Sequence, residues 1–283
     1  MSTVAILGAG DLGAALAQSL ASRGRVSAIR LIDENAELAA GKGLDIQQAG
    51  PVERYETHLS ASSDVLAASG AAVIVIADDS ARGEWTGDAG LALIRQLITA
   101  GTRAPLVFAG SNQTPLMEMA ARELEIDADR MIGTAASAMV GVARSLVALD
   151  SGGSTRDVHV VVTGRPPAFV VAWSSATIAG MPVVERVAAH RLVALAGATV
   201  SLWPPGPRAI ASASAPIVEA LIFGSRQLHQ AAAIIDGSVG ARGVAAMMPL
   251  ELRRGGISQR VAPKFSALER VELENSIARL RQR

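Results

Sequence analysis

Three glycines near the start of the chain have the spacing of a phosphate-binding turn. Gly8, Gly10 and Gly13 form a G-x-G-x-x-G pattern after residues 3–7, an apolar, β-branched run typical of a buried strand. Residues 14–23 then carry apolar side chains at helical spacing. In such a turn the glycines permit tight bending and close backbone approach, and the helix N-terminus offers free N–H groups to a diphosphate.

An acid lies 20 residues beyond the last of these glycines. Asp33 ends a second predicted strand, residues 27–33, where a carboxylate can accept hydrogen bonds from ribose hydroxyls and would repel a 2′-phosphate. Together the turn and the acid predict a dinucleotide site, for NAD rather than NADP. The alternatives are a plain glycine turn and a solvated acid, and the adjacent Glu34 could take the place of Asp33.

The rest of the first half alternates between strand-like and helix-like segments, which indicates βαβ units and a doubly wound parallel sheet of the Rossmann type. The predicted helices are residues 36–49, 85–100 and one capped by Thr114 with Pro115 in its first turn, and the predicted strands are residues 71–77 and 105–109. We expect an α/β protein with an NAD-binding domain at 1–135.

The second half is less regular and predicts an α+β domain at 136–283. Helices are expected at residues 135–149, 183–198 and 210–223, strands at 157–163, 229–235 and 244–248, and a turn at 254–256. Ser266 and Glu269 have the spacing of a capping box before a final amphipathic helix that reaches about Arg281.

Composition excludes several classes of function. Lys and Arg together number 26, as do Asp and Glu, so nothing favours a nucleic-acid or anionic-membrane partner, and low net charge permits self-association. The chain has no cysteine, which excludes thiol catalysis and fits a cytoplasmic location. The amino-terminal residues do not have the pattern of a signal peptide, and no apolar run is long enough to span a bilayer.

Further segments resemble the L-lactate/malate dehydrogenase family. Besides residues 5–13 and 31–34, the segment Gly-Leu-Asp-Ile-Gln-Gln-Ala at 43–49 is the more telling match, because many families share the glycine pattern. Other matches are residues 111–112, 156–159, 180–182 and 254–257, so the resemblance covers nearly the whole chain. It implies a dehydrogenase-like C-terminal domain, an NAD cofactor, a small hydroxy or oxo acid substrate, and a homodimer or homotetramer.

The resemblance also implies catalytic residues that this chain does not have. The family uses an aspartate and a carboxylate-binding arginine in D-x-x-R on a helix, and a histidine in G-x-H-G after a strand. At the matching positions this chain has Met139, Val142 and Pro166, none of which can transfer a proton or hold a carboxylate. None of its four histidines has such a sequence frame, and no pair has metal-ligand spacing.

Only a few residues remain as expected ligand contacts. Arg82 lies in the segment between Asp78 and Gly90 that corresponds to the family's mobile loop, and Arg165 adjoins Pro166; either is more commonly a surface charge. Asn112 matches an asparagine that contacts the nicotinamide ribose and substrate in the family. The cofactor-binding residues expected from pattern and resemblance are Gly8, Gly10, Asp11, Leu12, Gly13, Asp33, Ala77 and Asn112.

Three functions follow as hypotheses. The first is an NAD-binding protein of the oxidoreductase class that is poor or inactive in malate and lactate oxidation. The second is a working NAD-dependent dehydrogenase with an altered site for a hydroxy or oxo substrate. The third, a purely structural protein, is disfavoured by the intact glycines and Asp33. A positioned acid–base group contributes about 10²–10⁴-fold to rate, or roughly 3–5 kcal/mol, which favours the first over normal malate or lactate oxidation.

Overall fold

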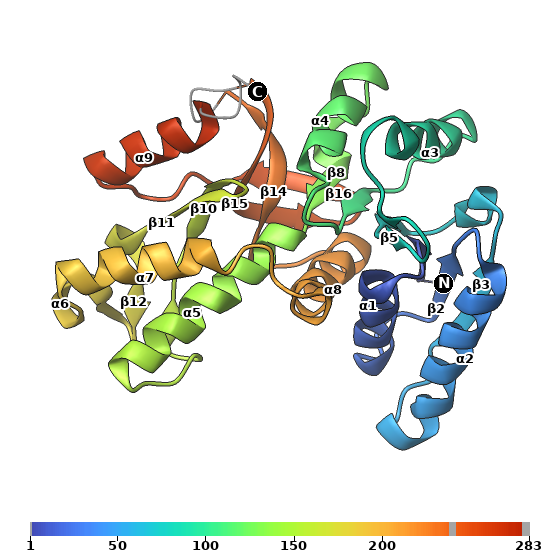
Figure 1. Ribbon diagram of the computed structural model, residues 1–283, viewed down its shortest axis with the longest axis horizontal. Coiled ribbons are helices and arrows are strands. Elements are labelled where there is room, and N and C mark those ends of the chain that lie inside the picture. Colours follow the sequence, from blue (N-terminus) through green and yellow to red (C-terminus); the bar gives the residue numbers. More distant parts are fainter. Residues whose placement is uncertain (1, 238–241, 279–283) are drawn as a thin grey trace.

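A computed structural model describes residues 2–237 and 242–278. Its large sheet runs through both halves of the chain and carries helices on its faces (Figure 1). The helices are α1 Asp11–Ser22, α2 Ala36–Glu53, α3 Gly87–Thr99, α4 Thr114–Glu123, α5 Ala138–Ser151, α6 Val183–Arg186, α7 Ala189–Ser201, α8 Pro207–Phe223 and α9 Ala267–Ala278. The strands are β1 Thr3–Leu7, β2 Ala28–Ile32, β3 His58–Ser62, β4 Val73–Ile76, β5 Asp78–Asp79, β6 Gly83–Glu84, β7 Leu106–Phe108, β8 Met131–Gly133, β9 Val158–His159, β10 Val162–Arg165, β11 Ala168–Val171, β12 Thr177–Ile178, β13 Met181–Pro182, β14 Leu228–Asp236, β15 Arg242–Arg253 and β16 Gly256–Arg260.

The first half forms the predicted parallel sheet. Its strands stand in the order β8-β7-β4-β1-β2-β3, and every neighbouring pair is parallel. Strand order reverses between β1 and β4, so the loops after these two strands leave the sheet side by side at its carboxyl edge. In open α/β sheets ligands bind in the crevice at this switch point. The glycine turn follows β1, and the segment beginning with Asp78 follows β4.

Apolar runs explain why the central strands are buried. All four residues of β4 are buried, as expected of a parallel strand covered on both faces. One face of the sheet packs against α1 through Leu16 and Leu20, and the other packs against α3 through Ile94 and Leu97. This packing holds the ends of β1 and β4 in fixed relative positions.

The second half extends the same sheet with antiparallel strands. β8 pairs with β14 through Gly133 and Ala232, and the sheet continues through β15, β10 and β11, with β16 on β15. The expected division at residue 135 lies just after β8, in the turn that leads into α5. α1 and α8 are tied together because the buried Glu219 carboxylate accepts hydrogen bonds from Arg23 and Arg25.

Several predicted boundaries in the second half are wrong. Residues 157–163 do not form one strand but belong to β9 and β10, which pair with different partners. The helix predicted at 183–198 is two, because the backbone is extended at Val187 and Ala188. The strand predicted at 244–248 belongs to the longer β15. In the first half, α1 begins at Asp11 and not at residue 14.

The capping box before the last helix is confirmed. The Ser266 hydroxyl accepts from the Glu269 amide at 3.3 Å, and the Glu269 carboxylate accepts from the Ser266 amide at 2.8 Å. The predicted helix end near Arg281 lies outside the described residues. None of the described helices is long and apolar enough to span a membrane.

Candidate functional site

The glycine turn forms the link that its sequence predicts. It joins β1 to α1, and Gly8 has a φ of +111°, a conformation that residues with a side chain rarely adopt. A Cβ on Gly13 would lie 2.0 Å from the carbonyl oxygen of Gly8, so close helix–strand packing requires glycine there. The Lys42 ammonium, from α2, donates to the Ala9 carbonyl oxygen at 2.6 Å. The amide groups at the start of α1 therefore stand at the switch point, as a diphosphate site requires.

Those amide groups already bind an acid from the same chain. The Asp78 carboxylate accepts hydrogen bonds from the Leu12 amide at 3.0 Å and from the Gly13 amide at 2.7 Å. The Asp78 carbonyl oxygen accepts from the Gly10 amide at 2.9 Å. A carboxylate is stabilised at a helix N-terminus by these N–H groups and by the helix dipole. Asp78 thus occupies the donors that the sequence assigns to phosphate.

The glycines of the turn make room for Asp78. A Cβ on Gly8 would lie 2.2 Å from the Asp78 carbonyl oxygen, and a Cβ on Gly10 would lie 2.3 Å from its Oδ2 atom. Heavy atoms that are not bonded do not approach so closely. The close approach that the fingerprint reserves for a ligand is used here by the chain itself.

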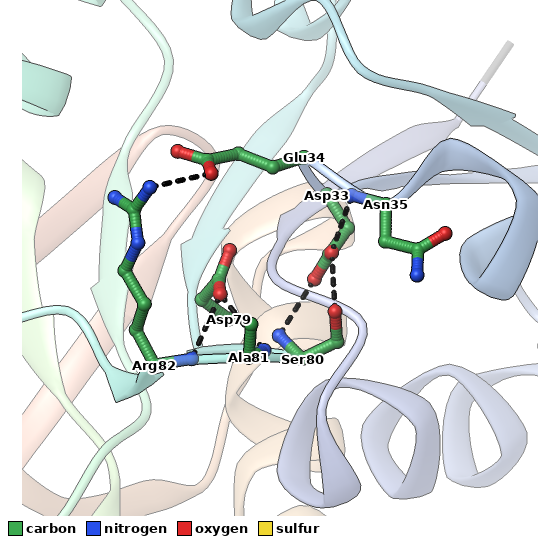
Figure 2. Close-up of polar contacts among 7 residues, drawn as sticks. All are labelled: Asp33, Glu34, Asn35, Asp79, Ser80, Ala81 and Arg82. Carbon is green, nitrogen blue, oxygen red and sulfur yellow. Dashed lines mark hydrogen bonds and ion pairs between the residues drawn. The ribbon is translucent and has the colours of Figure 1, made fainter.

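The acid predicted to bind ribose is also engaged. Asp33 follows β2 and is 3% exposed. One carboxylate oxygen accepts from the Ala9 amide at 2.7 Å and the Ser80 amide at 2.9 Å; the other accepts from the Ser80 hydroxyl at 2.6 Å and the Asn35 amide at 3.0 Å. Figure 2 shows Ser80 facing the Asp33 carboxylate. Ser80 therefore supplies the hydroxyl contact that a ribose would make.

The two acids differ in electrostatics. Burial would raise the pKa of Asp33, but its hydrogen bonds, led by that of the Ser80 hydroxyl, outweigh burial and hold the pKa below its ordinary value of 3.8. Burial is the largest influence on Asp78 too, and there it prevails: the pKa is raised although the Leu12 and Gly13 amides oppose the change. The nearby charge of Asp11 adds to the increase.

A third carboxylate covers the end of β7. Glu84, in β6, accepts from the Ser111 amide at 2.8 Å, the Ser111 hydroxyl at 2.9 Å and the Asn112 amide at 2.7 Å. A Cβ on Gly110 would lie 2.7 Å from the Glu84 carboxyl carbon, so a side chain at this position would push the Glu84 carboxylate aside. Asp78 and Glu84 are the two ends of the β5–β6 hairpin, which therefore bridges the carboxyl ends of β4 and β7.

The turn of this hairpin is held by local contacts, shown in Figure 2. One oxygen of the buried Asp79 accepts from the Ala81 amide at 2.9 Å and from the Arg82 amide at 3.0 Å. The Arg82 guanidinium donates to the Glu34 carboxylate at 2.6 Å, and both side chains are more than half exposed. We name residues 78–84 the plug segment.

Two comparisons show similarity along the whole chain. It is 29% identical to the malate dehydrogenase of Thermomicrobium roseum over 299 residues, covering 99% of this chain and 96% of that protein. It is 27% identical to the malate dehydrogenase of Thioalkalivibrio sulfidiphilus, covering 99% and 98%. No protein-family model matches the chain.

Solved structures share the fold. A minor L-lactate dehydrogenase from Enterococcus mundtii has a TM-score of 0.89 at 19% identity, covering 99% of this chain and 96% of that one. A malate dehydrogenase from Salinibacter ruber has a TM-score of 0.84 at 21% identity, covering 99% and 95%. The chain is a homologue of malate dehydrogenases and shares the fold of lactate and malate dehydrogenases. Its mixed α/β sheet is the architecture of these dehydrogenases.

The positions predicted to match the dehydrogenase catalytic residues are occupied by two apolar residues and a proline. Met139 is fully buried in the core between α5, β10 and β15, and Val142 is partly buried against the same cluster. Pro166 lies in the turn between β10 and β11. Arg144 donates to the Thr155 carbonyl oxygen at the far end of α5.

A cavity of about 10 Å³ adjoins Pro166 and has room for about one water molecule. It has no titratable side chain among its described lining residues, which are Phe108, Gly110, Ser111, Thr114, Met117, Gly133, Ala135, Ala136, Pro166, Trp203 and Ala232. The four histidines, all within the described part of the chain, are absent from this lining. A hydroxy acid and a nicotinamide ring do not fit such a space.

The three expected substrate contacts are engaged with the protein. Arg165 pairs with Glu118 of α4 at 2.9 Å, and both side chains are largely buried. Arg82 pairs with Glu34, as described above. The backbone amide of Asn112 donates to the Glu84 carboxylate, and the side-chain amide of Asn112 donates to the Ser111 hydroxyl at 3.3 Å. Among residues 2–237 and 242–278, no group of three or more His, Asp or Glu side chains is placed to bind a metal ion.

The expected cofactor residues lie together, but their arrangement does not fit a bound dinucleotide. Ala77 is fully buried, and its carbonyl oxygen accepts from the Gln113 amide group at 2.9 Å. Asp11 is exposed at the start of α1. The donors on Leu12 and Gly13 hold Asp78, and the lone pairs of Asp33 are engaged by protein groups. A diphosphate and a ribose would have to displace these contacts.

Sequence reasoning missed Asp78, Ser80 and Glu84. A signal for the first was present, because two acids directly follow the apolar run that became β4. Parallel strands end at one edge of the sheet, so acids after β4 must lie near the turn after β1. Ser80 and Glu84 lie in a segment without periodicity, and nothing in the sequence indicates their partners.

Proposed function

We propose that the protein is a catalytically degenerate homologue of the lactate and malate dehydrogenases, which does not oxidise malate or lactate by the family's route. The small apolar cavity at Pro166 carries this proposal. Hydride transfer from a hydroxy acid needs a base for the hydroxyl proton and a cation for the carboxylate. No group of either kind lines the cavity among its described residues.

The typical contributions of such groups to rate support a large loss of malate and lactate turnover. Removing an acid–base group costs roughly 10²–10⁴-fold in rate, or about 3–5 kcal/mol. Truncating one partner of a buried charged pair typically costs about 2–5 kcal/mol more at a binding site. Lactate or malate turnover should therefore fall by several orders of magnitude relative to a complete family member.

NAD remains the cofactor that we propose for the protein. The support is the intact turn of Gly8, Gly10 and Gly13 at the switch point, with Asp33 beside it. This proposal requires a second arrangement in which the plug segment has left the turn. A small hydroxy or oxo acid is the class of molecule that the family suggests beside the nicotinamide.

We also propose a homo-oligomer, a dimer or a tetramer. Leu44 and Val52 on α2 are 58% and 84% exposed although both are apolar, and the formal net charge of the chain is zero. Light scattering on the purified protein tests this. A mass of one chain at micromolar concentration would contradict it.

The catalytic proposal is tested by a steady-state assay. L-Malate and L-lactate are offered with NAD⁺ and NADP⁺, and oxaloacetate and pyruvate with NADH, while absorbance of the reduced nicotinamide is followed. The malate dehydrogenase of Thermomicrobium roseum is the positive control under the same conditions. We expect no turnover above the rate without protein. Robust turnover of either acid would refute the proposal, and turnover of a different hydroxy or oxo acid would favour a working dehydrogenase with an altered site.

A further inference from the structure

The plug segment reproduces, with protein atoms, the polar contacts of a dinucleotide. A carboxylate lies where the fingerprint places a diphosphate, and a hydroxyl lies on the acid that the fingerprint assigns to ribose. We propose that residues 78–84 are a built-in competitor of the dinucleotide, held in the cofactor cleft by Asp78 and Ser80. This inference rests on the proposed NAD site and concerns its regulation.

Asp78 is suited to replace a phosphate because it uses the same donors in the same way. Its two carboxylate oxygens accept separately from the consecutive amides of Leu12 and Gly13 at 3.0 and 2.7 Å. Its carbonyl oxygen takes the third amide of the turn, that of Gly10. An anionic ligand at this helix N-terminus needs the same N–H groups, so the two anions exclude each other.

Ser80 acts at the other end of the expected ligand. Its hydroxyl and its amide donate to different oxygens of Asp33, at 2.6 and 2.9 Å. Asp33 also accepts from the Ala9 and Asn35 amides, so four donors converge on one carboxylate. A carboxylate has about four lone-pair sites, and a ribose could bind only after Ser80 leaves.

The contacts of the plug segment are linked by its short backbone. Asp78 and Ser80 are separated by one residue, and Asp79 closes the turn onto the Ala81 and Arg82 amides. The β5–β6 pairing connects Asp78 to Glu84, which is bound at the end of β7. Moving Asp78 far enough to admit a diphosphate therefore disturbs Ser80 as well. Two mutually exclusive states follow, one closed by the segment and one open to a dinucleotide.

Such competition has a quantitative signature. When only a fraction of the protein is open, the apparent dissociation constant equals the intrinsic one divided by that fraction. A segment closed in about 90% of molecules weakens binding about tenfold. Removing one of its contacts should raise the open fraction and so restore the affinity for every ligand that binds the open state.

Calorimetry with two probes, NAD⁺ and inorganic pyrophosphate, tests this on the full chain. Asp78→Ala should bind both probes at least about tenfold more tightly than the wild type, because it frees the Leu12 and Gly13 amides. Ser80→Ala should also bind both probes more tightly, because weakening one end of the segment raises the open fraction and the segment leaves the turn as a unit. Asp88→Ala is the matched control, since it removes an exposed acid from the first turn of α3; it should behave as the wild type.

The outcomes separate the inference from the proposed cofactor. A gain for pyrophosphate but not for NAD⁺ in Asp78→Ala would support a protein anion at the turn and would refute the NAD proposal. Equal affinities of wild type and Asp78→Ala for both probes would overturn the inference. If Asp78→Ala does not fold, Asp78→Asn replaces it, because the amide has the same shape without the charge; a gain for pyrophosphate is again required. Thermal unfolding of each variant establishes that it is folded.

Discussion

The hydrogen bonds that the Asp33 carboxylate accepts predict that replacing Asp33 destabilises the folded protein, whether or not a ligand is bound. Replacing Asp33 by Asn keeps the shape but turns one acceptor oxygen into an NH₂ group. If the NH₂ group takes the place of the oxygen nearest the Ser80 hydroxyl, that hydroxyl can rotate and accept a hydrogen bond from it. The Asn35 backbone amide, which donates to the same oxygen, then has no acceptor. If the NH₂ group faces the other way, the Ala9 and Ser80 amides both lose their acceptor.

The magnitude follows from these losses. One buried donor left without an acceptor costs about 1–3 kcal/mol, and hydrogen bonds to a charged group are worth about 1.5–3 kcal/mol where neutral ones are worth about 1 kcal/mol. We expect Asp33→Asn to lower the free energy of unfolding by about 3 kcal/mol at pH 7. Urea unfolding measures it, with Glu34→Gln as the control. Glu34 is exposed and pairs with an exposed arginine, so its replacement should change stability by less than about 1 kcal/mol.

The pH dependence of this difference is the sharper test. The pKa of Asp33 is lower in the folded protein than its ordinary value of 3.8, because its hydrogen bonds outweigh burial. Its stabilising effect is therefore fully present above pH 3.8 and is lost as pH falls through the lower folded-state value. The difference between wild type and Asp33→Asn should be constant near neutral pH and narrow below pH 3.8. A loss no larger than that of Glu34→Gln, or a difference that widens in acid, would refute the reasoning.

Three further predictions concern the rest of the fold. Glu219→Gln should lower the free energy of unfolding by about 2 kcal/mol in urea titrations, because its buried carboxylate joins α8 to two half-exposed arginines of the α1 region; an unchanged midpoint would contradict this. Burial lowers the pKa of His229 below 6.5, so its contribution to stability is present above pH 6.5 and lost as pH falls. As pH falls below 6.5, the free energy of unfolding of His229→Gln should therefore decrease less than that of the wild type, and equal decreases would count against this. Ser266→Ala removes the hydroxyl of the capping box and should cost about 1 kcal/mol in thermal or urea unfolding, whereas no change would show that Glu269 alone caps α9.

The parallel half of the fold could be predicted from sequence because its signals are local. β1 has the predicted bounds, and the glycine turn, α2 and β4 fall where apolar periodicity and turn residues place them. In the second half, the strand boundaries depend on which segments pair in the folded sheets. Residues 157–163 have one β-rich composition but serve two sheets, and no Gly or Pro marks the break between α6 and α7.

The residues of the candidate site could be predicted from the sequence, but not the groups to which they are hydrogen-bonded in the folded protein. The positions of Gly8, Gly10, Gly13 and Asp33 follow from spacing alone. The partner of the turn does not, because Asp78 is 65 residues from Gly13 in sequence and its carboxylate meets the amide only after the sheet has formed. Position on a parallel sheet predicts which segments meet, but side-chain chemistry at the meeting point depends on the loop conformation.

A crystal structure of the wild-type protein grown without nucleotide or added phosphate tests the account most directly, because it shows which atoms accept hydrogen bonds from the Leu12 and Gly13 amides. We predict that the carboxylate of Asp78 accepts from both. An Asp78 carboxylate turned away from these two amides would contradict the account.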